Sequence, residues 1–329
     1  MSFFSAVSEL LHPAPAPDEN VRRALDRVCE LVDPLLRTVG SFEKKLSGPV
    51  HYALGYCDGL VASLPGPVEI SRPAFSNDPL IHSLFATATD IDQMLGRSQA
   101  IRDYLAEPCS WEDDYFYAML AARRQEKKQL GMAQQGDVIR NDVPQTVLYF
   151  SGQTLIEPNC QLEATLHGLR CKTFESLLHT FRSHVEALRG ERDGLRADVT
   201  EERNHITVLN GHSSKQAYDC ATRHLAELDA QLRAKAESLM PEHLIDALAD
   251  YLMSPEPALR LTPVSLTVDR LGVIQNVPAD DASVHTITFP ELTARDRRLH
   301  LAMLARISRD EALEAVEMVR DEQHRFMII

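Results

Sequence analysis

The stretch that decides the fold runs from Phe174 to Leu209 and reads FESLLHTFRSHVEALRGERDGLRADVTEERNHITVL. Positions spaced alternately four and three residues apart carry nine apolar side chains in eleven, whereas composition alone would place about five there. This heptad spacing predicts a long amphipathic helix. Residues Asn210 to Ser213 form a turn signature, and the spacing resumes from Ser214 to Leu239. Because a short turn brings the second helix back along the first, we predict an antiparallel coiled-coil hairpin.

Segments rich in β-forming residues lie on both sides of this hairpin. Before it, residues 146–150 (TVLYF) and 153–157 (QTLIE) flank a Ser-Gly pair, which predicts two strands joined by a two-residue turn. After it, apolar and polar residues alternate over 264–269 and again over 285–289, which predicts half-buried strands. We therefore expect one small antiparallel sheet, with the helical hairpin (about 161–254) as an insertion.

The segment before the first strands shows helical spacing. From Asp18 to about Gln135 the apolar residues recur every three to four positions. Ser110 with Asp113 resembles a capping box, which predicts a helix over 111–130. The N-terminal part of the chain is therefore expected to be entirely helical.

The C-terminal part is expected to combine the sheet with further helices. Residues 295–329 show helical spacing, and Ser308 with Glu311 forms the pattern of a capping box. The predicted fold class is α+β, mainly α with a small antiparallel β-sheet. We expect a helical domain over 1–135 and a second domain over 136–329, which holds the sheet, the coiled-coil hairpin and the C-terminal helices.

Composition and charge restrict the possible functions. The 329 residues include 34 basic and 48 acidic side chains, a net charge of −14, so we expect no nucleic-acid binding driven by phosphate neutralisation. No apolar run is long enough for a transmembrane helix, and the N-terminal residues lack the basic start of a secretory signal. The six cysteines are scattered, which is typical of reduced, mostly buried thiols. These features predict a cytoplasmic protein.

The common phosphate-cradle, zinc-protease, hydrolase and calcium-loop motifs are absent from the sequence, and we expect no cofactor and no metal. Cys160, His167, Cys171 and His179 come closest to a metal site, because His167 and Cys171 share a helix face. Their spacing matches no zinc module. We therefore interpret His167 as a solvent-facing or capping residue and both cysteines as core thiols.

Two further clusters have both a functional and a structural interpretation. Residues 111–117 (WEDDYFY) combine carboxylates with aromatics, as in an acid–base site, but acidic residues also favour the first turn of a helix. A basic cluster late in the chain could meet phosphate or an acidic partner, although a solvated helix face or pairing within the chain accounts for it more simply. The basic cluster consists of Arg295, Arg297, Arg298, His300, Arg306 and Arg309.

The predicted hairpin leads to the main functional hypothesis. A long helical hairpin has a small core for its length and presents its tip or flank to a partner. The polar heptad positions Arg192, Glu202 and Lys235 favour a register-setting or partner-facing role. We expect a non-catalytic interaction or scaffold protein that binds another protein or a second copy of itself. The candidate contact residues are Ile206, Leu209, Asn210, His212, Tyr218, Phe326 and Ile328.

The alternative hypothesis is an enzyme or a small-ligand sensor. Its pocket would lie between the helical N-terminal domain and the sheet, because clefts form where such layers meet. The sequence assigns no catalytic residue to this alternative.

Overall fold

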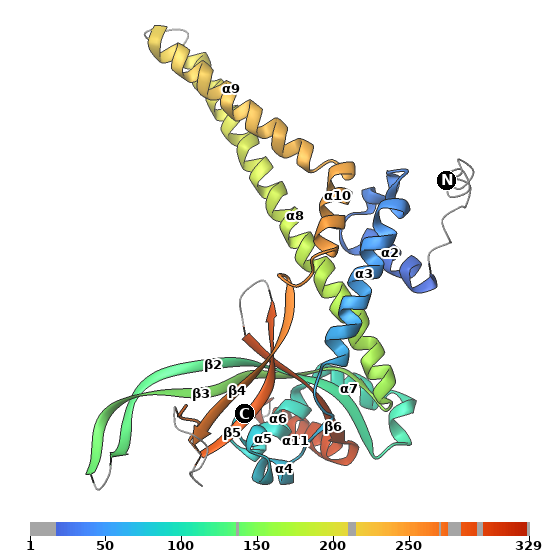
Figure 1. Ribbon diagram of the computed structural model, residues 1–329, viewed down its shortest axis with the longest axis vertical. Helices are drawn as coiled ribbons and strands as arrows, with labels where there is room; N and C mark the ends of the chain where they lie inside the picture. The colour runs from blue at the N-terminus through green and yellow to red at the C-terminus, as the bar shows by residue number, and fades with distance from the viewer. Residues whose placement is uncertain are drawn as a thin grey trace, which may run out of the picture. The chain divides into compact units, whose positions relative to one another are not determined.

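The computed structural model describes residues 18–135, 138–209, 215–269, 271–275, 284–294 and 299–327 (Figure 1). Helices and a six-stranded sheet are both present, so the predicted α+β fold class is confirmed. The helices are α2 (Glu19–Leu31), η1 (Pro34–Thr38), α3 (Phe42–Ala62), α4 (Arg72–Asn77), α5 (Pro79–Leu84), α6 (Ala88–Arg97), α7 (Gln99–Ala106), η2 (Pro108–Trp111), α8 (Leu162–Leu209), α9 (Lys215–Ser238), α10 (Pro241–Leu252) and α11 (Arg309–Met327). The strands are β1 (Val68–Ile70), β2 (Tyr115–Gln135), β3 (Val138–Asn159), β4 (Leu259–Asp269), β5 (Val284–Ala294) and β6 (Leu299–Ser308).

The chain divides into two compact units, each assembled from two separate stretches of sequence. The first, which we call the helical unit, combines Met1–Gly55 with Phe174–Pro255. The second, the sheet unit, combines Tyr56–Thr173 with Glu256–Ile329. Pairing of β2 with β6 joins the two stretches of the sheet unit, and side-chain contacts such as the Asp33–Arg189 ion pair join those of the helical unit.

The helical unit has its own hydrophobic core. In α2, Val21, Leu25 and Val28 recur every three to four residues and are buried, as an amphipathic helix requires. The Tyr251 hydroxyl of α10 donates a hydrogen bond to a backbone oxygen of α8, and its ring lies 5.3 Å from that of Phe181. Further core side chains from α8 and α10 are Phe174, Leu177, Leu178, Val185, Leu244, Ile245, Leu248 and Leu252.

The sheet unit is built on strands in the order β3-β2-β6-β5-β4. These neighbours are antiparallel, and β1 pairs with β6 in parallel. A short segment links the two edge strands, because Val273 bridges to Val147 of β3 and Ile274 bridges to Val268 of β4. Strands β4 and β5 confirm the alternation predicted over 264–269 and 285–289.

The core of the sheet unit lies against one face of β2. Phe116, Ala118, Leu120 and Ala122 alternate along this strand and are all buried. They belong to a cluster that also includes side chains of α5, α6, α7 and α11, so these four helices share the core of this face. A smaller cluster lies apart from this core and consists of Val61, Leu169 and Leu304. Met119, on the opposite face of β2, packs against it.

The helix predicted over 111–130 is wrong. The chain forms the short helix η2 and then enters strand β2 at Tyr115. Ser110 caps no helix there, and its hydroxyl donates to the backbone oxygens of Leu105 and Glu107. Strand β2 forms because β3 and β6 pair with its two edges, and such long-range pairing outweighs a local helical spacing.

The hairpin predicted over 146–157 is also wrong. Residues 146–150 and 153–157 belong to one continuous strand, β3, and its hairpin partner is β2. Gly152, with a φ of 63°, lies in a β-bulge where β3 has one residue more than β2. Two further bulges coincide with the positive φ values of Asp142 and Glu157. The predicted turn is therefore a bend within a strand.

The C-terminal region is only partly helical, which corrects the prediction for 295–329. Leu299–Ser308 forms β6, a central strand, and α11 follows it. Residues 301–305 are all buried, so the strand lacks the two-residue alternation that would reveal it in the sequence. The predicted cap is present, because the Ser308 hydroxyl accepts a hydrogen bond of 3.5 Å from the Glu311 backbone N–H.

Candidate interaction surfaces

The helical hairpin of α8 and α9 is the first candidate surface. Lys235 Nζ lies 2.7 Å from a carboxylate oxygen of Glu191, and an Arg203 guanidinium nitrogen lies 3.1 Å from Asp229. The later residue of α8 pairs with the earlier residue of α9, so the two helices run antiparallel (Figure 1). The predicted antiparallel arrangement is therefore present, whereas coiled-coil packing of the helices stays a prediction.

The heptad positions form the protected face of both helices, but they bury little. Between Val185 and Leu239, the described residues include only three buried side chains, Val199, Ala221 and Leu228. Val208, next to the stripe, is 71% exposed. The other apolar heptad side chains are half-buried; they are Leu188, Leu195, Ile206, Leu209, Leu225, Leu232 and Leu239. The two helices thus leave much of their shared apolar stripe within reach of solvent.

The polar heptad side chains of α8 pair with near neighbours in the sequence, and that of α9 pairs across the hairpin. Arg192 contacts Asp193 at 2.7 Å, and Glu202 lies 3.4 Å from His205. Lys235 pairs with Glu191 across the hairpin and lowers the pKa of that carboxyl below its usual value. Each of these ion pairs has at least one well-exposed partner, so they add little to stability.

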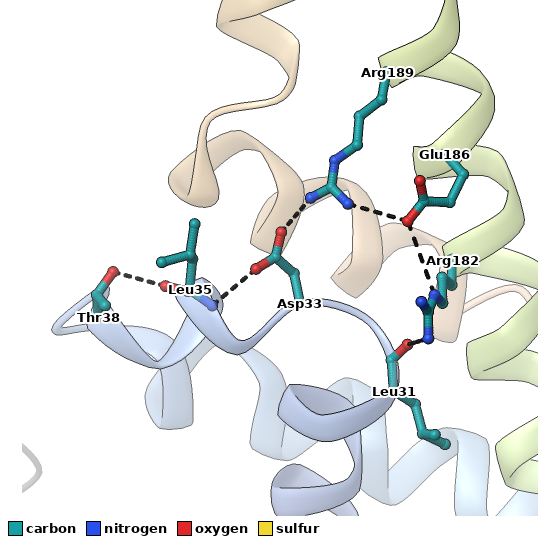
Figure 2. Close-up of polar contacts among 7 residues, drawn as sticks. All are labelled: Leu31, Asp33, Leu35, Thr38, Arg182, Glu186 and Arg189. Atoms are coloured by element: carbon teal, nitrogen blue, oxygen red, sulfur yellow. Dashed lines mark hydrogen bonds and ion pairs between the residues drawn. The ribbon is translucent and has the colours of Figure 1, made fainter.

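The hairpin is anchored at its base by a buried aspartate. Asp33 caps η1 by accepting a 2.8 Å hydrogen bond from the Leu35 N–H, and its other carboxylate oxygen pairs with Arg189 of α8 (Figure 2). Arg189 also contacts Glu186 at 3.2 Å, and Arg182 reaches the Leu31 backbone oxygen at 3.5 Å. Asp33 is only 7% exposed, so this ion pair fixes α8 at the point where the core of the helical unit ends.

A groove of about 690 Å³ lies between the two hairpin helices beyond this anchor. A Cβ atom added at Gly190 or Gly194 would meet nothing within 4 Å, so the α8 backbone is open on this side. The groove is lined by Glu191, Gly194, Leu195 and Asp198 of α8 and by Gln231, Ala234, Lys235 and Ser238 of α9.

The predicted contact residues are only partly placed. Ile206 and Leu209 end α8, Tyr218 lies in the first turn of α9, and all three are half-buried. Asn210, His212 and Ile328 lie outside the described residues. Phe326 belongs to α11 of the sheet unit, and its side chain is also outside the described part.

The possible metal ligands do not assemble into one cluster. Cys171 Sγ lies 3.9 Å from His167 Nε2, whereas the Cys160 thiol contacts the side chain of Asn159. Within the described ranges, no group of three or more histidine, cysteine or acidic side chains could hold an ion. The expectation of mostly buried thiols is wrong: Cys29 and Cys57 are buried, whereas Cys109, Cys171 and Cys220 are exposed.

The two clusters with alternative interpretations are partly described, and neither functional interpretation is tested; no helix begins within 111–117, so the helix-start interpretation does not apply there. Trp111 is 65% exposed, whereas Phe116 is buried in the core below the sheet. Arg306 pairs with Glu69 at 2.9 Å, and its guanidinium lies 4.6 Å above the ring of Tyr115. Pairing within the chain is thus confirmed for Arg306. Arg295, Arg297 and Arg298 lie outside the described residues.

The sheet unit offers a second groove, of about 660 Å³, between α6, α7 and β3. It opens at the Gly152 bulge, where β3 bends away from regular pairing. Its polar lining includes Asp90, Gln93, Arg97 and Gln153. Gln153 is held in place, because its amide donates hydrogen bonds to the Leu84 and Phe150 backbone oxygens. Both helices and the strand belong to the sheet unit, and a ligand-binding role for this groove stays a prediction.

Sequence reasoning missed a third surface, a ribbon made of Arg123–Gln135 in β2 and Val138–Ser151 in β3, whose β3 edge is bridged at Val147 by Val273. The Arg123–His300 pair is the last between β2 and β6, and beyond it β2 pairs with β3 alone among the described residues (Figure 1). Leu130 and Met132 are 67% and 72% exposed. The sequence did not reveal this surface because residues 111–130 were expected to form a helix. In a helix the charged residues of this segment would point in different directions, whereas in a strand alternate residues share a face.

Comparison with protein families, curated proteins and solved structures finds no match to this chain. In the parts of the chain that the structure describes, no helix has the length and apolarity needed to span a bilayer. We therefore infer function from the surfaces themselves.

Proposed function

We propose that the chain is a non-catalytic interaction or scaffold protein that binds another protein, or a second copy of itself, through the helical hairpin. The observation that carries the proposal is the poorly covered apolar stripe beyond the Asp33–Arg189 anchor. A helix pair that buries three side chains over this length gains little stability of its own. Contact with a partner would cover the half-exposed residues Ile206, Leu209 and Tyr218.

The test replaces residues 200–222 with a short Gly-Ser turn. Among the described residues, this removes one buried side chain, Ala221, and the Arg203–Asp229 and Glu202–His205 pairs. We therefore expect the thermal unfolding of the remaining chain to change little. Immobilised full-length and shortened proteins are then incubated with lysate of the native host, and the captured proteins are compared by mass spectrometry. Partners that bind both forms equally would contradict the proposal.

A matched pair of substitutions refines the assay. Ile206→Glu places a charge on the half-buried stripe, whereas His205→Glu changes a neighbour whose side chain is 54% exposed. We expect the first to abolish capture and the second to preserve it, with equal helicity by circular dichroism. Equal effects of the two substitutions would argue that the stripe is not the contact surface.

The second candidate function is binding of a small ligand, favoured by the groove beside the Gly152 bulge. A ligand that binds the native state raises the melting temperature by mass action, so a thermal-shift screen against nucleotides and metal ions tests it. A shift that disappears in Arg97→Met would assign binding to this groove. A flat screen would leave the hairpin as the functional surface.

A further inference from the structure

One face of the ribbon concentrates positive charge. In a strand, alternate residues share a face, so Arg123 and Lys127 lie on the same side of β2. Arg140 joins them, because it pairs with Ala133 of β2 across the ribbon. All three side chains are exposed, and we call this surface the cationic face. The β3 residues that pair with this side of β2 from Arg123 to Gly131 are neutral: Ser151, Tyr149, Val147, Gln145 and Val143.

Among the described residues, the one carboxylate at a paired position of the ribbon lies on the other face. Glu126 is on the opposite face, where it pairs with Arg124 at 2.6 Å. Arg124 also binds Glu291 of β5 at 2.5 Å, so its charge is compensated. Asp142 lies in a bulge between the paired residues. Strand register therefore places three exposed cations on one face of a chain whose net charge is −14, whereas the opposite face carries Lys128 and the paired Arg124 and Glu126.

An oppositely charged surface lies on α11 of the same unit. Asp310, Glu314, Glu317 and Asp321 follow one another at spacings of four, three and four residues, which places them on one side of the helix. All four are exposed, and we call them the acidic stripe. Asp310 lies 3.8 Å from its neighbour Arg309, and this is the one ion pair that the described residues give the stripe.

The dimensions of the two surfaces are compatible. The stripe extends over about 16 Å, at 1.5 Å per residue of helix. Arg123 and Lys127 are about 13 Å apart, at 3.3 Å per residue of strand. Among the described residues, no ion pair joins the cationic face to the stripe, so both surfaces of one copy are available to another.

We propose that the cationic face of one copy docks on the acidic stripe of a second copy. Different patches meet in this contact, so it is heterologous, and a bound pair still presents one unused patch of each kind, one on each copy. The chain therefore assembles stepwise into rings or open chains rather than stopping at a symmetric dimer. The hairpin has no part in this contact.

The first measurement is sedimentation velocity of the full chain at several salt concentrations. Exposed ion pairs are screened when the Debye length falls from about 10 Å at 0.1 M salt to about 3 Å at 1 M. We expect the average sedimentation coefficient to rise with protein concentration at low salt and to return to the monomer value at high salt. A monomer under all these conditions would overturn the proposal.

Adjacent lysines provide a matched pair of variants. Lys127→Gln removes charge from the cationic face, whereas Lys128→Gln removes the same charge from the opposite face. Both side chains are exposed, so neither change is expected to affect folding. We expect only Lys127→Gln to weaken self-association. Equal effects would show that net charge, rather than this face, controls assembly.

A mixing experiment tests the heterologous geometry. One variant carries Lys127→Glu on the ribbon, and the other carries Glu317→Lys on the stripe. Each alone is expected to stay monomeric. Their mixture is expected to form a heterodimer and nothing larger, because each supplies the surface that the other lacks. Absence of a heterodimer overturns the proposal.

Two further measurements distinguish this contact from binding through the hairpin and from binding of a nucleic acid. The protein shortened at 200–222 should self-associate as the full chain does, which keeps the test independent of the hairpin function. A gel-shift assay tests whether the protein binds a short DNA duplex instead. If it does, and if Lys127→Gln abolishes this binding, the cationic face binds a nucleic acid and the proposal is wrong.

Discussion

Arg189→Met tests the anchor at the base of the helical hairpin. The substitution keeps the aliphatic stem of Arg189 and removes the guanidinium that pairs with the buried Asp33. The Asp33 carboxylate then retains the hydrogen bond that it accepts from the Leu35 N–H. A fully buried charge that loses its partner costs about 3–5 kcal/mol.

The cost at this site is expected to be smaller. The Arg189 side chain is 32% exposed, so water can reach the space it leaves. The value for a hydrogen bond to a charged group therefore applies, and we expect a loss of about 2 kcal/mol in the free energy of unfolding. In a domain of this size, a loss of 1 kcal/mol lowers the melting temperature by about 3 °C, so we expect a decrease of about 6 °C.

Circular dichroism follows the unfolding of the helices, and Trp111, the single tryptophan, reports separately on the sheet unit. The control is Arg182→Met. The Arg182 side chain is 49% exposed and its contacts are longer than those of Arg189, so we expect this substitution to lower the free energy of unfolding by less than about 0.5 kcal/mol. In an Asp33→Asn background, Arg189→Met should also cost little, because no buried charge remains. Equal costs for Arg182→Met and Arg189→Met, or equal costs in both backgrounds, would refute the reasoning.

Two predictions concern the sheet unit. A Cβ at Gly96 would lie 2.3 Å from the Ala315 backbone oxygen, so Gly96→Ala should lower the free energy of unfolding by about 1–3 kcal/mol. A Cβ at Gly59 would meet nothing within 4 Å, so the control Gly59→Ala should raise this free energy by up to about 1 kcal/mol. Denaturant titration measures both, and equal effects would contradict the close contact. Burial raises the pKa of the Cys57 thiol to about 12, from 9.0. The unfolded chain releases this proton at a lower pH than the folded chain, so the Cys57 contribution to the free energy of unfolding should be constant below about pH 9 and fall by about 1.4 kcal/mol per pH unit from there to about pH 12. Cys57→Ala should lack this contribution, so its free energy of unfolding should depend less steeply on pH above about pH 9. An equal slope in the two proteins would contradict the prediction.

Some features of the fold were evident from local sequence. The heptad spacing of residues 174–239 predicted two antiparallel helices, and the heptad positions are their protected face. Ser308 with Glu311 marked the start of α11, and alternation marked β4. These signals are readable because caps, turns and one-sided burial depend on residues a few positions apart.

Other features depend on partners distant in the sequence. Strand β2 is a strand because β3 and β6 pair with it, and β6 is buried on both faces, which removes any alternation. The bulge at Gly152 resembled a hairpin turn, because glycine with a positive φ suits both. The discontinuous units follow from the same long-range pairing.

The candidate surfaces divide in the same way. The sequence by itself determined the hairpin stripe with Ile206, Leu209 and Tyr218, since a helical period needs no tertiary partner. Only the tertiary structure decided where Arg189, Lys127 and Arg140 act. Arg189 meets Asp33 through the packing of the helical unit, and strand register places Lys127 and Arg140 on one face. Net charge is a sum over the chain, whereas binding depends on which charges share a surface, and that is fixed by long-range pairing.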